Sequence, residues 1–183
     1  MPTLLIQRGK GGKDYQEVGP EFPLATEIVQ DKNNRLSDLL VTSRVYQTDL
    51  REIPGIGTAA AYAAGEAFGT KFSIPVPVQG TISRIAFLDL DDEGLRKDFV
   101  LFSRDFTATA DNAAFNLSDG DLAYCLGVLS VDNFFNWGAN QLGQVYPAFD
   151  YIAPDGLLYC QIVTQGADNI AAGAIPKFFL TVV

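Results

Sequence analysis

The sequence predicts an all-β protein, a two-sheet sandwich of about eight strands that follows an extended N-terminal arm. From residue 59 to the C-terminus every persistent pattern is that of a strand, and turn residues separate the strands. Of the 183 residues, 48% are hydrophobic, 19% are charged and 13 are Phe, which favours a folded protein packed with aromatic side chains. A chain of this length can bury one good core, so we expect one main domain with an appendage.

The arm is predicted over residues 1–57 and the sandwich domain over residues 58–183, because a Pro-Gly-Ile-Gly sequence breaks the chain between them. Near its start the arm has Arg8, Lys10 and Lys13 among three glycines. This flexible basic stretch has two interpretations, a segment that lies against an acidic neighbour and a frayed, solvated terminus. Both remain open from the residues alone.

Two apolar side chains of the arm, Phe22 and Leu24, lie beside Pro20 and Pro23. Prolines hold the chain extended, and the apolar side chains next to them suggest docking on a neighbouring surface. Together with the three basic residues, Phe22 and Leu24 are therefore candidate partner contacts.

The strands of the domain are taken in chain order. Residues 68–78 are strand-like but contain two prolines, which place the strand at an edge or a bend. Residues 80–89 alternate more cleanly and predict a strand buried on both sides for part of its length. An acidic turn at residues 91–94 then predicts a hairpin tip before the strand of residues 96–104. Later strands are predicted at residues 128–133, 144–149, 157–164 and 177–183.

Residues 99–130 combine a strand, a polar loop, a short helical turn and another strand. Apolar residues in both phases up to Phe102 predict a largely buried strand that enters a polar turn. The sequence Ala-Asp-Asn-Ala-Ala-Phe at residues 110–115 predicts an ordered loop anchored by its Phe. Ser118 fits the N-cap of a short helix with two Asp residues in its first turn, and a strand resumes at residues 124–131.

This block resembles a group of small tailed-phage virion proteins, the head decoration or cement proteins. The likeness lies in Phe-Ser-Arg at residues 102–104, the loop at residues 110–115 and Ser-Asp-Gly-Asp-Leu at residues 118–122, and it extends more loosely from residue 58 to the C-terminus. The resemblance implies a sandwich of the jelly-roll type that assembles as trimers on capsid surfaces. Similar domains also occur in fibres and other virion parts.

The net charge of −9 argues against nucleic acid as a partner, because phosphate binding needs a cationic surface. No apolar run reaches the length of a membrane span, and the N-terminus lacks the pattern of a signal peptide. We therefore expect no membrane partner and synthesis in a host cytoplasm. Cys125 and Cys160 are expected to be buried free thiols, because cytoplasmic assembly disfavours disulfides.

The residue types argue against enzymatic chemistry. The chain has no His, which removes Ser-His-Asp and Cys-His catalysis and the usual zinc sites. Four acids, Asp89, Asp91, Asp92 and Glu93, could hold calcium, but their spacing is not that of an EF-hand and a solvated acidic hairpin is favoured. No particular carboxylate pair stands out for glycoside hydrolysis. We expect no enzyme activity, no cofactor and no metal site.

An aromatic group close to residue 137 has two interpretations. Phe134, Phe135, Trp137 and Tyr146 fill a core by default. The alternative is a subunit interface, where such side chains are common anchors. Asn and Gly beside Trp137 indicate a loop, which adds weight to the interface interpretation but leaves core filling as the default.

The resemblance implies a structural virion protein on the capsid surface that binds and stabilises the assembled capsid as a homotrimer, with the major capsid protein as its partner. Under this hypothesis Arg8, Lys10, Lys13, Phe22 and Leu24 contact the capsid. The alternative is a carbohydrate-binding or adhesion module of a phage head or tail fibre, with a host-surface glycan as ligand.

Overall fold

The computed structural model describes residues 5–9, 13–17 and 45–183, and the chain divides into two compact units, residues 1–44 and 45–183. In the first unit, β1 (Leu5–Gly9) and β2 (Lys13–Glu17) pair as an antiparallel hairpin. The hairpin ladder includes the backbones of Arg8 and Lys13, so these two are strand residues and not parts of a flexible stretch. The other three candidate contacts, Lys10, Phe22 and Leu24, lie outside the described residues.

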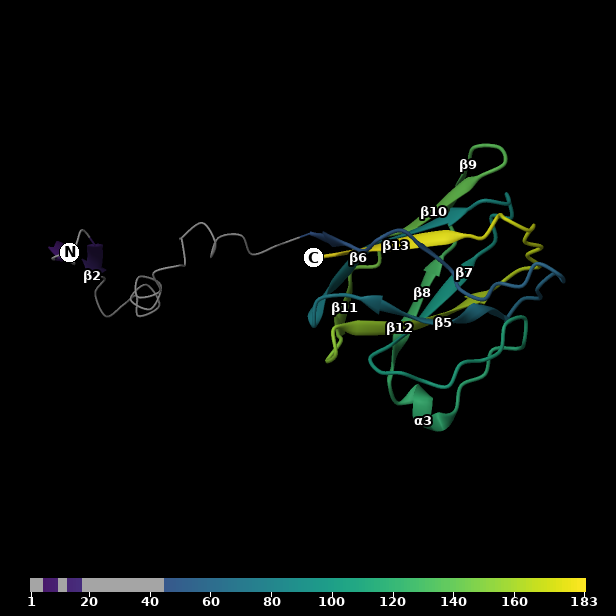
Figure 1. Ribbon diagram of the computed structural model, residues 1–183, viewed down its shortest axis with the longest axis horizontal. Coiled ribbons are helices and arrows are strands. Elements are labelled where there is room, and N and C mark those ends of the chain that lie inside the picture. The colour runs from purple at the N-terminus through teal and green to yellow at the C-terminus, as the bar shows by residue number, and fades with distance from the viewer. Residues whose placement is uncertain (1–4, 10–12, 18–44) are drawn as a thin grey trace. The chain divides into compact units, whose positions relative to one another are not determined.

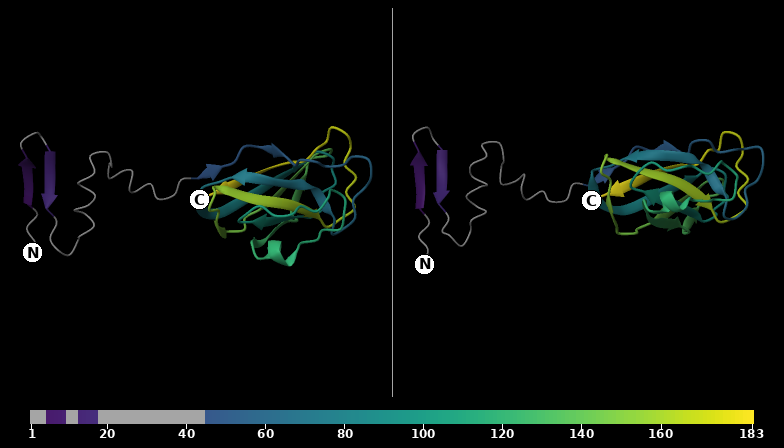
Figure 2. Two further views of the ribbon diagram at one scale, coloured as in Figure 1. Left: turned by 60° about the horizontal axis from the view of Figure 1, so that its bottom comes forward. Right: turned by 90° about the horizontal axis from the view of Figure 1, so that it is seen from below.

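The second unit consists of two antiparallel sheets packed as a sandwich, as predicted (Figures 1 and 2). The larger sheet contains β3 (Tyr46–Gln47), β4 (Arg51–Glu52), β6 (Gln79–Asp89), β9 (Phe134–Asn136), β10 (Gln141–Val145), β11 (Phe149–Ile152) and β13 (Lys177–Val182). The smaller sheet contains β5 (Ala67–Pro75), β7 (Lys97–Phe102), β8 (Cys125–Val131) and β12 (Leu157–Thr164).

The strand order is that of a jelly roll. In the larger sheet β3 and β4 both pair with β13, β13 pairs with β6, and β10 and β11 both pair with β6. The smaller sheet runs in the order β5, β12, β7, β8. If β3 with β4 and β10 with β11 are each counted as one strand, the sandwich has eight strands in two Greek keys, and the chain changes sheet at every connection except the one from β7 to β8. β9 is an extra strand at the edge of the larger sheet.

The second unit starts at Val45, thirteen residues before the predicted start of the sandwich domain. β3 and β4 line up along β13, and the N–H of Ile53 donates to the carbonyl of Pro176 at 3.1 Å. The Ile53 side chain lies in the core. Strands of two residues are too short to show a period, which is why the sequence pattern did not reveal them.

The connection between β6 and β7 is not the predicted hairpin, because these strands belong to different sheets. The Asp89 carboxylate holds the turn by accepting the backbone N–H groups of Asp91 and Gly94, at 3.0 and 2.6 Å. Asp91 and Glu93 accept the N–H groups of Ala171 and Asn169. The acidic turn is thus bonded to the loop between β12 and β13 and is not simply solvated.

β7 is buried along its whole length and confirms the prediction of a buried strand. Phe99 and Leu101 face the main core between the sheets. Val100 and Phe102 belong to a second cluster on the other side, which Phe115 and Leu117 of the following loop cover. In Figure 1 this loop and α3 (Asp119–Leu122) lie at the bottom, beside the smaller sheet and away from β10 and β13.

Local predictions in this block are confirmed. Ser118 is the N-cap of α3, and its hydroxyl accepts the N–H of Asp121 at 3.1 Å.

The strand of residues 157–164 has the predicted bounds. The strand predicted at residues 144–149 is instead broken between β10 and β11, because the intervening segment contains Pro147 and a positive φ of 48° at Ala148. Both cysteines are free thiols, Cys160 buried and Cys125 half-buried.

Candidate functional site

The described residues contain no group of three or more acids and cysteines that could hold a metal ion. Each of the four acids near residue 91 accepts at least one backbone or side-chain amide N–H group. Among these same residues no helix is long and apolar enough to cross a membrane. The features that remain include two larger surface depressions, of about 360 and 290 Å³, and a set of exposed aromatic side chains.

One part of the solvent-facing side of the larger sheet is apolar. Successive side chains of a strand point to opposite faces, and Ile85 and Phe87 of β6 point into the core. Leu88 therefore faces outward, where Leu142 of β10 lies opposite it and Phe135 of β9 lies opposite Leu142. We call this surface the outer face, and its members are Arg84, Leu88, Phe135, Trp137, Leu142 and Phe179.

The four aromatic residues predicted as one group differ in burial. Phe134 packs against the core, with its ring centroid 6.2 Å from that of Phe87. The side chain of Phe135 is 49% exposed, and those of Trp137 and Tyr146 are each 69% exposed. Core filling is therefore the role of Phe134 only, because neighbouring residues of β9 point to opposite faces.

The turn that carries Trp137 is held in one conformation. Asp92 Oδ1 accepts the side-chain amides of Asn136 and Gln141, at 2.7 and 2.5 Å, and so ties the acidic turn to both strands of the β9–β10 hairpin. The backbone N–H of Trp137 donates to the carbonyl of Asn140 at 3.0 Å. Little conformational entropy is therefore lost when a partner covers the indole.

A depression of about 290 Å³ lies on the outer face. Leu88, Leu142, Phe179 and Trp137 supply apolar lining, and Asn140, Gln141 and Arg84 supply polar groups. The Arg84 guanidinium lies over the Phe179 ring at 5.1 Å, and its Nε is buried without a hydrogen-bond partner among the described residues. Arg84 and Phe179 are site residues that the sequence analysis missed, because only the pairing of β6 with β13 brings them together.

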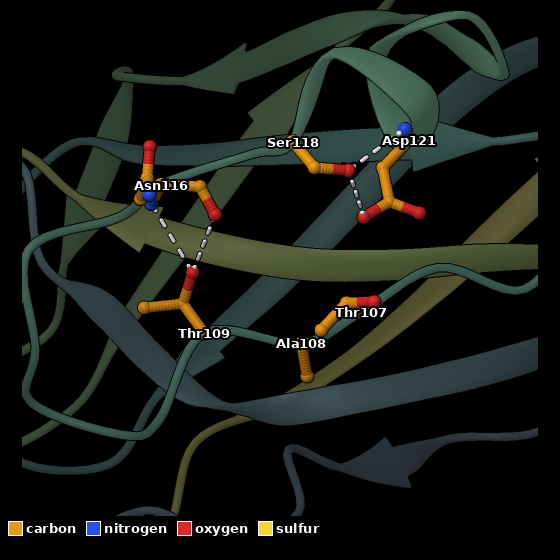
Figure 3. Close-up of a pocket in the computed structure, with 6 residues that line it drawn as sticks. All are labelled: Thr107, Ala108, Thr109, Asn116, Ser118 and Asp121. Atoms are coloured by element: carbon orange, nitrogen blue, oxygen red, sulfur yellow. Dashed lines mark hydrogen bonds between the residues drawn. The ribbon is translucent and has the colours of Figure 1, made fainter.

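A second depression, of about 360 Å³, lies under the loop that precedes α3 and is drawn in Figure 3. Thr109 exchanges hydrogen bonds with the backbone of Asn116, and the Ser118 hydroxyl donates to the Asp121 carboxylate at 2.8 Å (Figure 3). These polar groups bond mainly to one another, so this depression offers few free donors or acceptors. It is the weaker candidate for ligand binding.

The loop at residues 110–115 has a structural role. Asp111 accepts the Tyr62 hydroxyl and the Gly69 N–H on one oxygen, both at 2.7 Å, and the Gly57 N–H on the other at 2.8 Å. It thereby joins the loop to β5 and to the segment before β5. Phe115 anchors the loop to the second cluster, which confirms the predicted ordered loop.

The net negative charge of the protein comes from the second unit. Residues 45–183 contain 16 acidic and seven basic residues, whereas residues 1–44 contain six of each. The first unit is therefore neutral and the sandwich has a net charge of −9.

No family model, curated protein or solved structure matches the chain. The features of the chain that bear on function are the residues of the 99–130 block, the jelly-roll topology and the outer face. The block contains β7 and β8, which are two neighbouring strands of the smaller sheet, and the loop and α3 between them. The loop covers the outer surface of this sheet.

Proposed function

We propose that this protein is a structural virion protein, a decoration or cement protein that binds assembled phage capsids as a homotrimer. The observation that carries the proposal is the outer face, where Phe135 and Trp137 are exposed on a rigid hairpin beside Leu88 and Leu142. Exposed aromatic side chains next to an apolar sheet surface are typical of protein interfaces. The resemblance of the 99–130 block to capsid decoration proteins supports the choice of partner.

The outer face is assigned to contacts between the three copies. Trp137 is the expected anchor, because large aromatic side chains at the centre of an interface contribute most of the binding free energy. The acidic charge of the sandwich opposes association at long range, and the apolar character of the outer face avoids that repulsion locally.

The first unit is assigned to the capsid contact, together with the candidate residues Arg8, Lys10, Lys13, Phe22 and Leu24. A protein that binds only the assembled shell stabilises it by mass action. Three linked first units in one trimer bind more tightly than one, because the second and third contacts form at a high effective concentration. The major capsid protein is the partner in this scheme.

The solution mass of the full chain tests the trimer. Light scattering after size exclusion is expected to give three times the mass of one chain. Trp137→Ala is expected to give a folded monomer, and Val128→Ala, which removes a comparably exposed apolar side chain from β8 in the smaller sheet, is the matched control that stays trimeric. A monomeric wild-type protein at high concentration would contradict the trimer.

Binding to capsids tests the partner. Full-length protein is mixed with capsids that lack it, and the bound fraction is measured by sedimentation together with the temperature at which the shells open. Binding and a higher opening temperature are expected. If the protein remains in the supernatant at every concentration, the cement role is wrong.

A carbohydrate-binding role is the second candidate, and the depression beside Trp137 favours it. The exposed indole can stack on a sugar ring, and the side chains of Asn140 and Gln141, which line the same depression, can form hydrogen bonds with it. A glycan array separates the two roles, since selective binding that Trp137→Ala abolishes would support adhesion. A cement protein is expected to bind no glycan selectively.

A further inference from the structure

Lys97 and Asp168 form an ion pair inside the sandwich unit. Lys97 is the first residue of β7, and Asp168 lies in the loop after β12. The side chains are 2% and 0% exposed, and Lys97 Nζ lies 2.7 Å from Asp168 Oδ1. Burying two opposite charges requires that both lose their hydration, so the free-energy gain of such a pair over an apolar one is small or absent.

Two aromatic rings lie against the amine of this pair, and hydrogen bonds with neighbouring groups hold the amine and the carboxylate. Nζ lies over the rings of Phe68 and Phe87, at 5.0 and 5.6 Å from their centroids. It also donates to the carbonyl of Leu95 at 2.7 Å, and Asp168 Oδ2 accepts the hydroxyl of Thr164. The amine and the carboxyl group are therefore held in contact in a single geometry.

Two further carboxyl groups, those of Asp89 and Glu93, lie close enough for their charges to act on Lys97. Glu93 Oε1 accepts the backbone N–H of Asn169, the residue after Asp168, at 3.0 Å. Burial raises the pKa of Glu93, and the charges of Asp168, Asp89 and Asp91 raise it further. Burial also lowers the pKa of Lys97 against the opposing influence of Asp168. These shifts favour a neutral Lys97 amine, whose free lone pair is the nucleophilic form, and a protonated Glu93 carboxyl group beside it.

We propose that Lys97 and Asp168 condense into an intramolecular isopeptide bond between Nζ and Cγ. The ammonium first transfers one proton to the carboxylate, which gives an amine and a carboxylic acid. The nitrogen lone pair then attacks Cγ, the C–N bond forms, and one carboxyl oxygen leaves as water with two of the former ammonium protons. The third proton stays on the amide nitrogen, so a cation and an anion become one neutral amide and one water, and no oxidant or cofactor takes part. Glu93 relays the proton from nitrogen to the departing oxygen.

The bond would lock the sandwich. It joins residues 71 positions apart, the start of β7 and the loop that follows β12. A covalent link over a long loop reduces the conformational freedom of the unfolded chain, and condensation replaces two buried charges by a neutral group. The inference does not depend on the capsid role.

Intact mass under denaturing conditions tests the bond in the full-length wild-type protein. The expected mass is that of the sequence less one water. Trypsin is expected not to cut after Lys97, and digestion should yield a branched peptide that contains both Lys97 and Asp168. The same digest holds an internal control, because Lys177 pairs with Glu52 at 3.1 Å on the surface and trypsin should cut after it normally. A mass equal to that of the full sequence, with cleavage after Lys97, would overturn the proposal.

Glu93→Gln tests the proton relay. Freshly synthesised Glu93→Gln protein is expected to have the mass of the unlinked chain and to lose water at least tenfold more slowly than the wild type. Glu52→Gln, which changes an exposed acid, is the control that links at the wild-type rate. Equal rates for Glu93→Gln and the wild type would remove Glu93 from the mechanism.

Discussion

At the scale of single residues, two buried tyrosines differ in whether their hydroxyl is bonded. The Tyr62 hydroxyl donates to Asp111 at 2.7 Å, whereas the Tyr151 hydroxyl is buried and has no hydrogen-bond partner among the described residues. Burial raises the pKa of Tyr151 to about 12, and the charge of Tyr46 adds to the shift. The hydroxyl of Tyr151 is therefore protonated near neutral pH.

This difference predicts opposite effects of the same substitution. Tyr62→Phe is expected to lower the free energy of unfolding by about 2 kcal/mol, because a hydrogen bond to a carboxylate is lost. Tyr151→Phe removes an unsatisfied hydroxyl and is expected to leave stability unchanged or raise it by up to about 1 kcal/mol. Urea unfolding followed by fluorescence measures both. A destabilised Tyr151→Phe protein would contradict the assignment of an unpartnered hydroxyl.

Asp98 predicts how stability depends on pH. Burial raises the pKa of this carboxyl, but bonds from Arg96, Ser130 and Gln165 outweigh burial and lower it below its usual range. A carboxyl group with a lowered folded-state pKa binds its proton more weakly in the folded state, so its contribution to stability is present above the unfolded pKa of about 4 and is lost as pH falls below it.

The corresponding measurement is the melting temperature between pH 7 and pH 3. The wild type is expected to lose stability as pH falls below about 4, and Asp98→Asn is expected to show a shallower decrease. Asp132→Asn, at an exposed position close to Arg96, serves as the control and should follow the wild-type curve. If the two variants have the same slope, Asp98 is not the group responsible.

At the scale of elements, β5 departs from regular geometry where it meets the segment before it. Gly69 has a φ of +78°, and a Cβ at this position would lie 2.6 Å from the carbonyl oxygen of Pro54. The pairing of β5 with β12 is irregular between Cys160 and Ile162, close to this glycine. A glycine is required here both for the backbone angle and for the close approach of Pro54.

A comparison of Gly69 with Gly65 separates the cost of the positive φ from the cost of the close contact with Pro54. Gly65 has a φ of +87° and open space around the position of a Cβ. Gly65→Ala is expected to cost about 1 kcal/mol for backbone strain alone. Gly69→Ala adds a clash with fixed backbone, and the total is expected to reach about 3 kcal/mol. Equal losses on thermal unfolding would mean that the Pro54 contact can relax.

Sequence patterns predicted most strands of the sandwich, because side-chain alternation and turn residues are local signals. They did not reveal β3 and β4, which are too short to show a period, nor the break at Pro147 within the strand of residues 144–149. The prediction of a hairpin tip at the acidic turn after β6 is wrong, because the residues of a tight turn are the same whether the chain returns to its own sheet or crosses to the other one.

At the scale of the whole molecule, the division into two units predicts that the sandwich unit can be produced without the first unit. Residues 45–183 contain the complete jelly roll and both apolar clusters, so this fragment is expected to fold alone with the melting temperature of the full chain. Under the proposed function it should remain trimeric and lose at least tenfold in capsid affinity, because the assigned capsid contacts are missing. Sedimentation with capsids measures the affinity. Unchanged affinity would place the capsid contact on the sandwich.

The candidate site shows the same division between local and long-range information. The sequence predicts Phe134, Phe135, Trp137 and Tyr146 as interface candidates, and the structure exposes all of them except Phe134. The sequence did not indicate Arg84, Leu88 or Phe179, which come from β6 and β13 and join the outer face through strand pairing alone. Nor did it distinguish Phe134 from Phe135, since which side of β9 is buried depends on the register with β10.

By itself the sequence determined the all-β class, the positions of most long strands, the Ser118 cap and the anchored loop at residues 110–115. These features follow from side-chain periodicity and from bonds between residues close in the chain. Three features depend on contacts between distant segments: residues 45–57 belong to the sandwich, the acidic turn crosses between the sheets, and Lys97 meets Asp168 in the interior. The geometry of those contacts is set by strand pairing and sheet packing, which no local pattern contains.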